Sequence, residues 1–129
     1  MRSIILWLII FAGGFIPVAR AEVPEALAIR ILIGEASGEG ERGMQAVAEV
    51  LRRRDSVRGF YGLNAPHVDK QPAYVWTMAR RAWYKSASSN ITRGADHFEG
   101  TDFKTPKWAR NKTPVVIIGR QKFYKLKGK

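Results

Sequence analysis

Apolar residues recur every three or four positions in three segments of the chain, and this spacing predicts three helices. The first is predicted from Pro24 to about Ala36, the second from Met44 to near Arg54, and the third after Pro72. Their apolar stripes contain Leu27, Ala28, Ile31 and Leu32 in the first helix, Val47, Val50 and Leu51 in the second, and Val75, Met78, Ala79 and Ala82 in the third.

The segments around these helices have a different pattern. A glycine-rich turn is predicted over residues 37–43, and a long loop over residues 55–71, where Gly and Pro interrupt the periodicity. A short strand is predicted over residues 94–98. The β-branched run at 115–118 and the segment 122–124 predict a hairpin, and the tail over 125–129 is expected to fray. The expected fold is therefore α+β, with three packed helices and a small antiparallel sheet near the C-terminus.

The N-terminus predicts a secretory signal over residues 1–21. Arg2 precedes an apolar run from Ile4 to Ala12, and the segment 19–21 reads Ala-Arg-Ala, which fits the small-x-small cleavage pattern. The apolar run is shorter than the roughly 20 residues that a spanning helix needs. An uncleaved membrane anchor is the alternative interpretation. We expect residues 22–129 to form one domain, exported to the periplasm, envelope or exterior without stable membrane insertion.

Composition narrows the chemistry. The 129 residues contain no cysteine and only two histidines, which excludes disulfides, thiolate metal sites and a three-histidine zinc site. The formal net charge of +11 favours a polyanionic partner. The basic runs at 52–54 and 80–81 are consistent with electrostatic attachment to such a partner. Because an exported protein seldom meets nucleic acid, we expect no nucleic-acid partner.

Glu35 is the leading candidate for a catalytic acid. It follows the apolar run 31–34 at the end of the first predicted helix. Apolar surroundings and the negative end of a helix both raise the pKa of a carboxyl group, as a general acid near neutral pH requires. Gly34 beside it is expected to let a substrate approach closely. The alternative is that Glu35 simply faces solvent.

Other residues suggest binding rather than catalysis. Glu39 and Glu41 lie in the glycine-rich turn, where they either cap the next helix or position a substrate. Trp108 and Tyr124 have polar neighbours and are expected at the surface, where an aromatic ring can stack on a sugar. His97 is expected to hydrogen-bond a neighbour, because no second metal ligand stands at a suitable spacing. Together these features suit an anionic glycan.

These residues occur in an order that resembles the SleB-type cell-wall hydrolases, which include the spore-cortex-lytic enzymes. The matching blocks are Gly34–Glu39 with Gly43–Leu51, then Gly94–Phe98, Pro106–Trp108, Ile118-Gly119 and Phe123-Tyr124. They span roughly residues 27–124. Two positions depart from the family pattern: Arg53 replaces an asparagine, and Gln121 replaces a histidine.

The resemblance implies a lysozyme-like, lytic-transglycosylase-type fold that acts on peptidoglycan. The expected cleavage is between N-acetylmuramic acid and N-acetylglucosamine, with Glu35 as the acid, no cofactor and a monomeric protein. The expected substrate contacts are Glu39, Asp96, His97, Phe98, Trp108, Gln121 and Tyr124.

The reaction outcome has two readings. Lack of an obvious second catalytic carboxylate favours a lytic transglycosylase, in which the C6 hydroxyl of the sugar attacks. Glu39 and Asp96 remain possible second acids, so hydrolysis stays open. Two non-enzymatic alternatives are a peptidoglycan-binding protein on the same fold and a cationic membrane-active protein, although the helical stripes are narrow for the latter.

Overall fold

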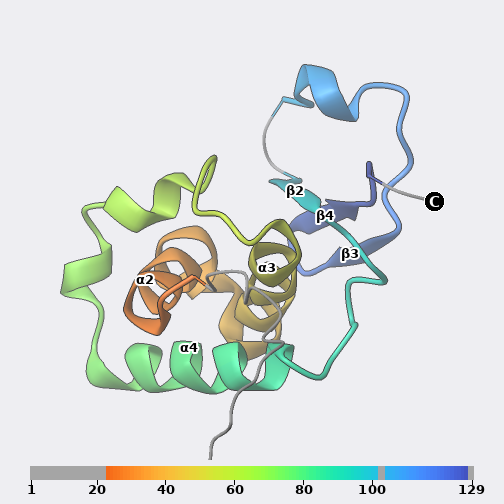
Figure 1. Ribbon diagram of the computed structural model, residues 1–129. Helices are drawn as coiled ribbons and strands as arrows, with labels where there is room; N and C mark the ends of the chain where they lie inside the picture. The colour runs from red at the N-terminus through yellow and green to blue at the C-terminus, as the bar shows by residue number, and fades with distance from the viewer. Residues whose placement is uncertain (1–22, 102–103, 128–129) are drawn as a thin grey trace, which may run out of the picture.

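The structure is a computed structural model that describes residues 23–101 and 104–127 (Figure 1). The signal predicted over residues 1–21 lies outside the described residues. The α-helices are α2 (Glu25–Ala36), α3 (Gly40–Arg54) and α4 (Ala73–Ser86), and the strands are β2 (His97–Gly100), β3 (Val116–Ile118) and β4 (Gln121–Tyr124). Short 3-10 helices are η1 (Ser37–Glu39), η2 (Tyr61–Asn64), η3 (Val68–Lys70) and η4 (Lys107–Ala109).

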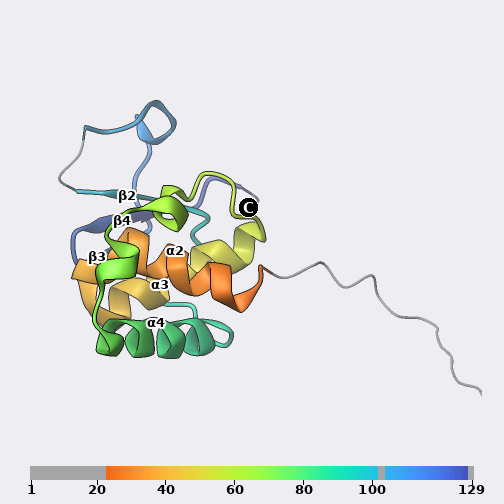
Figure 2. The ribbon, with the colours of Figure 1, turned by 90° about the vertical axis from the view of Figure 1, so that its left-hand side faces the viewer.

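The elements stack in layers, with α2 and α3 between α4 and the sheet (Figure 2). The core is apolar where these layers meet: Ile31, Leu32 and Met44 from the helices and Phe123 from β4 are fully buried. The α+β prediction is confirmed, because the described residues contain the three expected helices and one small antiparallel sheet. No helix in the described ranges is long and apolar enough to cross a membrane.

The sheet has the strand order β2-β4-β3, with both pairings antiparallel. The predicted hairpin is confirmed by the pairing of Val116 with Phe123. Strand β2 begins three residues later than predicted. Gly94 has φ +83, and the Ala95 carbonyl accepts a hydrogen bond of 2.8 Å from Arg53 Nη1. The chain therefore turns at these residues before it becomes extended.

Helix α3 begins at Gly40, four residues before the predicted start. The interruption between α2 and α3 is shorter than the predicted turn, because Gly40 at φ +76 changes the direction of the chain at a single residue. Glu41 then lies in the first turn, where its carboxylate pairs with Arg81 at 3.0 Å and Lys85 at 2.5 Å. Glu41 thus links α3 to α4 and is not the helix cap.

The segment 55–71, predicted as a loop, packs closely on α2 through η2 and η3. Val68 is fully buried, and a Cβ atom built on Gly34 would lie only 2.0 Å from the Gly62 carbonyl oxygen. The expectation that Gly34 leaves room for a substrate is therefore wrong. Its missing side chain lets the backbone of η2 rest against α2.

Members of the two basic runs also make contacts within the domain, which the sequence did not indicate. The Arg52 guanidinium lies 3.7 Å from the centre of the Trp83 ring, and Arg81 pairs with Glu41. The tail also departs from the prediction over its described part. The backbone amides of Leu126 and Lys127 both donate to the Asp96 carboxylate at 2.9 Å, so this stretch is held against the domain.

Candidate active site

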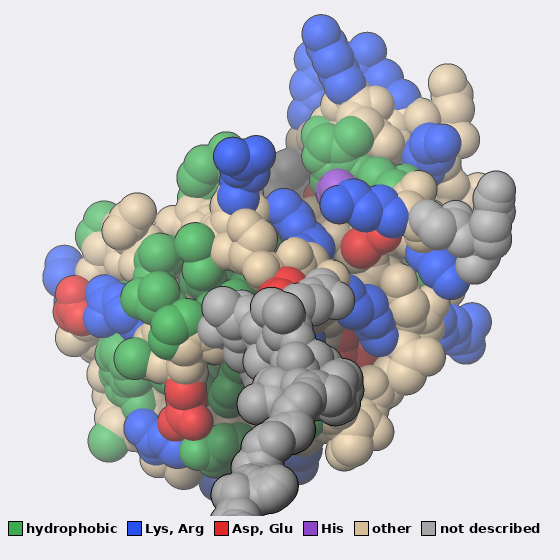
Figure 3. Space-filling view, viewed as in Figure 1, with side chains coloured by type: hydrophobic (Ala, Val, Ile, Leu, Met, Phe, Trp, Pro, Cys, Tyr) green, Lys and Arg blue, Asp and Glu red, His purple; other side chains and the backbone are tan. Residues whose placement is uncertain are grey.

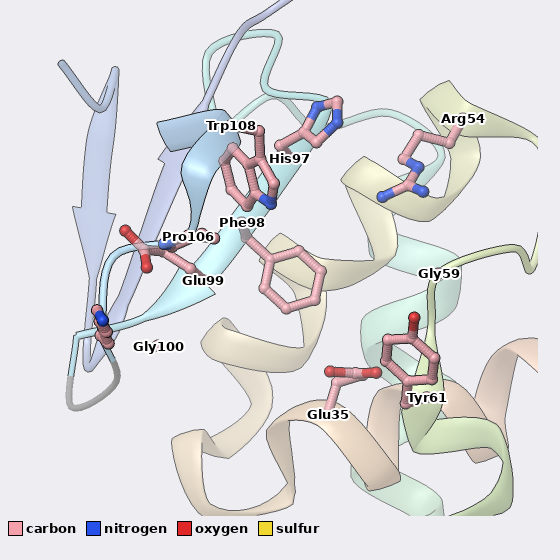
Figure 4. Close-up of a pocket in the computed structure, with 11 residues that line it drawn as sticks. Glu35, Arg54, Gly59, Tyr61, His97, Phe98, Glu99, Gly100, Pro106 and Trp108 are labelled. Atoms are coloured by element: carbon pink, nitrogen blue, oxygen red, sulfur yellow. The ribbon is translucent and has the colours of Figure 1, made fainter. Parts of the chain in front are cut away.

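Glu35 opens into a cavity of about 580 Å³ between the end of α2, the segment 54–61 and the sheet (Figure 4). Glu35 rises from the helical side, while His97 and Trp108 stand on the opposite side and Arg54 lies to one flank. The lining residues are Glu35, Arg54, Gly59, Tyr61, His97, Phe98, Glu99, Gly100, Lys104, Pro106 and Trp108.

The environment of Glu35 favours the protonated carboxyl group. Burial raises the pKa of Glu35, and the backbone amides of Gly62 and Tyr61 only partly oppose that shift. The Gly62 amide donates to Glu35 Oε2 at 2.7 Å, which fixes the direction of the carboxyl group. Since Glu35 belongs to the last turn of α2, the negative end of the helix acts in the same sense. A carboxyl group held this way is suited to donate a proton.

Aromatic rings form the wall that faces Glu35. The centroids of the Trp108 and His97 rings are 5.0 Å apart. The Trp108 and Tyr124 rings pack edge to face, with their centroids 5.2 Å apart and an angle of 89° between the ring planes. Trp108 is 36% exposed, and Tyr61 is 86% exposed on the other side of the cavity. Rigid aromatic surfaces that remain accessible are suited to contact the apolar faces of sugar rings.

Four of the predicted site residues line this cavity: Glu35, His97, Phe98 and Trp108. The other four, Glu39, Asp96, Gln121 and Tyr124, do not. Asp96 is buried and accepts hydrogen bonds from His97 Nδ1 and two tail amides. Burial alone would raise the pKa of Asp96, but these donors outweigh it and the pKa is lowered. Asp96 therefore anchors the tail and orients the His97 ring.

Glu39 and Gln121 support the cavity from outside. The Glu39 carboxylate accepts from the backbone and side chain of Arg120 at 2.9 and 3.0 Å, which ties η1 to the β3–β4 turn. Gln121 Nε2 donates to the Glu35 carbonyl at 3.3 Å, so this residue holds the backbone of the candidate acid. The surface position expected for Tyr124 is wrong, because only 2% of it is exposed. It packs beneath Trp108, whose segment covers the outer face of the sheet.

Arg53, the other departure from the family pattern, belongs to a buried network around Glu49. Its guanidinium donates to Thr92 Oγ1 and Asn90 Oδ1, both at 2.6 Å, and reaches Glu49 at 3.4 Å. Glu49 also accepts hydrogen bonds from Ser89 and from the backbone and side chain of Thr92. Neither Arg53 nor Gln121 lines the cavity, so neither replaces a side chain there.

Sequence reasoning missed Glu99, Tyr61 and two cationic residues, Arg54 and Lys104, that line the cavity. Glu99 is only 8% exposed, its Oε2 accepts from the Tyr124 hydroxyl at 2.8 Å, and its Oε1 has no partner among the described residues. Burial and this hydrogen bond raise the pKa of Tyr124 to about 12, so the hydroxyl remains a donor. Glu99 could have been predicted as a site residue because it directly follows Phe98, which was a candidate. Nothing in the sequence indicated Tyr61, because it reaches the cavity through the packing of Gly62 on Gly34, and these two glycines are far apart in the sequence.

The surface around the site is strongly cationic on the side of the sheet, where Lys and Arg side chains gather (Figure 3). Within residues 23–101 and 104–127, no group of three or more His, Cys, Asp or Glu side chains has the arrangement of a metal site.

The architecture is similar to that of a solved structure, the catalytic domain of the Bacillus cereus SleB protein. The two chains are 21% identical, the TM-score is 0.64, and the alignment covers 88% of this chain and 100% of that one. This chain has the SleB catalytic-domain fold. No protein-family model matches the sequence, and no curated protein matches it.

The SleB-like fold confirms the fold expected from the sequence motifs. It also explains why these motifs, far apart in the sequence, meet in one place. The block that begins at Gly34 supplies Glu35, while the later blocks supply His97, Phe98 and Trp108 on the facing wall.

Proposed function

We propose that this protein is a peptidoglycan-cleaving enzyme that breaks the bond between N-acetylmuramic acid and N-acetylglucosamine. The observation that carries the proposal is Glu35, a carboxyl group with a raised pKa that opens into a cavity walled by aromatic rings. The match to the catalytic domain of the SleB protein agrees with the resemblance of the sequence motifs to SleB-type cell-wall hydrolases, and this agreement supports the proposal.

In the proposed reaction, protonated Glu35 donates its proton to the glycosidic oxygen. The bond from the muramic acid C1 to that oxygen breaks, and C1 gains oxocarbenium character. The C6 hydroxyl oxygen of the same sugar then bonds to C1, and ionised Glu35 takes the hydroxyl proton. The products are a 1,6-anhydromuramoyl end and a free N-acetylglucosamine hydroxyl. No water is consumed, and Glu35 returns to its starting state.

The lytic transglycosylase route needs one carboxyl group, and Glu35 supplies it. The two acids considered from sequence as partners, Glu39 and Asp96, are committed to Arg120 and to the C-terminal tail. Hydrolysis is the second candidate, because Glu99 brings another carboxyl group to the lining. A two-carboxylate glycosidase uses its second group either as a nucleophile or to activate water.

We also propose that the protein is exported, with residues 1–21 as its signal, and acts as a monomer on the cell wall. The cationic surface near the sheet suits attachment to an anionic wall polymer (Figure 3). The alternative is a protein that binds peptidoglycan without cleaving it, in which the two departures from the family pattern would have replaced residues needed for catalysis. Arg53 and Gln121 instead contact the domain interior, which favours an enzyme.

The test is to incubate residues 22–129 with purified peptidoglycan and identify the released fragments by mass spectrometry. Anhydromuramoyl ends that disappear in Glu35→Gln support the transglycosylase. Reducing muramoyl ends identify a hydrolase. Binding of the folded protein without any fragments contradicts the enzymatic proposal and leaves the binding protein.

A further inference from the structure

The candidate cavity runs along the open edge of the sheet. Strand β2 lies at one end of the order β2-β4-β3, and all four of its residues, His97–Gly100, line the cavity. Successive side chains of a strand point to opposite faces. A cavity that touches four consecutive residues therefore meets the strand along its edge, where backbone groups are presented.

The pairing of β2 with β4 shows which backbone groups face this edge. The Thr101 amide donates to the Arg120 carbonyl at 2.8 Å, just beyond the paired residues Gly100 and Gln121. In an antiparallel pair, alternate residues bond to the partner strand. Odd-numbered residues of β2 therefore bond toward β4, and the amides and carbonyls of Phe98 and Gly100 face outward. Among the described residues, no backbone–backbone hydrogen bond outside the strand pairing uses these outward groups.

This edge suits an extended chain with several amide groups. Phe98 and Gly100 offer two donors and two acceptors, separated by about 7 Å along the strand, which is the repeat of an added β-strand. One acetamido group of a sugar would engage only part of this set. Arg54 and Lys104 add positive charge to the same lining, which suits carboxylates on the bound chain.

We propose that the open edge of β2 binds the peptide substituent of muramic acid by strand addition, while the sugar lies against Trp108. This inference rests on the proposed function, because it assigns part of the same substrate to the same cavity. It makes the protein selective for glycan strands that carry peptides over strands from which an amidase has removed them.

The first test is the variant Gly100→Pro, which removes one outward amide. Proline is tolerated on an edge strand where its nitrogen faces away from the sheet, and the extended Glu99 accommodates it. Gly100→Ala is the matched control, because it changes the same position but keeps the amide. Thermal unfolding checks that both variants are folded.

Each protein is assayed on peptide-bearing and peptide-free glycan strands, and the ratio of the two kcat/KM values is compared. We expect a ratio of about ten for the natural chain and Gly100→Ala, and a ratio near one for Gly100→Pro. A ratio near one for the natural chain overturns the inference. Equal loss on both substrates in Gly100→Pro also overturns it, because the edge then contacts the sugar.

A binding measurement separates this inference from the proposed function. The amide NMR signals of Phe98 and Gly100 are followed while the natural chain is titrated with a disaccharide-peptide fragment, which lacks the bond to be cleaved, and with the disaccharide alone. Shifts produced only by the peptide-bearing fragment support the inference, even if neither glycan substrate is cleaved. Absence of these shifts overturns it, even if cleavage occurs.

Discussion

Two carboxylates on neighbouring helices respond to the protein interior in opposite ways. Glu49 on α3 is more deeply buried, with only 1% of its surface exposed, yet its pKa is lowered. Glu35 on α2 is only partly buried, and its pKa is raised. Burial alone would raise the pKa of both groups. The donors that surround each carboxylate decide the difference.

The donors around Glu49 replace the water it lost. Ser89, Thr92 and the backbone amides of Ile91 and Thr92 outweigh its burial, and the Arg53 guanidinium lies nearby. Among the described residues, the Glu35 carboxyl group accepts hydrogen bonds from the η2 backbone, and it also lines the open cavity. The surroundings of Glu49 therefore favour its ionised form, and the surroundings of Glu35 favour its protonated form. This contrast distinguishes a structural carboxylate from a candidate acid.

The largest expected effect is that of Glu35→Gln on cleavage. The amide keeps the shape of the side chain but cannot donate a glutamic acid proton, so activity should fall by about a thousandfold or more. Fragment release from peptidoglycan measures this loss. Glu41→Gln is the matched control, since its carboxylate pairs with α4 and lies outside the cavity lining. Equal losses in the two variants would contradict the role of Glu35.

Glu49→Gln should destabilise the protein instead. The NH2 group of the new glutamine would point at hydrogen-bond donors that the carboxylate oxygen accepts from in the natural protein. Arg53 would also lose its anionic partner. We expect a loss of about 3 kcal/mol in the free energy of unfolding, measured in urea. Glu41→Gln, which disrupts an exposed pair with Arg81 and Lys85, should cost below about 1 kcal/mol. Similar losses of stability in Glu49→Gln and Glu41→Gln would show that the buried network around Glu49 contributes no more than an exposed ion pair.

Gly34→Ala tests how the candidate acid is positioned. The added Cβ would meet the Gly62 backbone at 2.0 Å, so η2 must shift together with the amide that holds Glu35. We expect a loss of about 2 kcal/mol in stability, with reduced cleavage by the folded protein. Gly38→Ala is the control, because its Cβ would approach only the flexible end of Arg120, at 3.5 Å. Retained stability in Gly34→Ala would contradict this packing.

Local patterns predicted much of the fold because they report local structure. The spacing of apolar residues located the three helices, and the β-branched run located the hairpin. Glu35 was visible because an apolar helix end precedes it. The pattern was silent on contacts between distant segments, such as the packing of Gly34 on Gly62.

Burial was also predicted wrongly for residues on the sheet face that another segment of the chain covers. Phe123 and Tyr124 point to opposite faces of β4, and alternation would expose one of them, but both are buried because Trp108 covers the outer face. Arg53 resembled a surface charge because its partners, Thr92 and Asn90, are nearly forty residues away. A run of like charges does not reveal which members turn inward.

The smallest expected effect is also the sharpest test of the two carboxylates, because their contributions to stability depend on pH with opposite signs. The lowered pKa of Glu49 gives stability above its ordinary value of 4.5, and this stability is lost as the pH falls through the folded-state pKa. The raised pKa of Glu35 makes ionisation costly, so its contribution falls as the pH rises above 4.5. Against the natural chain, Glu49→Gln should therefore recover at acidic pH, whereas Glu35→Gln should gain relative stability toward neutral pH. Thermal unfolding from pH 3 to pH 8 measures both differences, and parallel curves for the two variants would show that the surrounding donors do not separate these carboxylates.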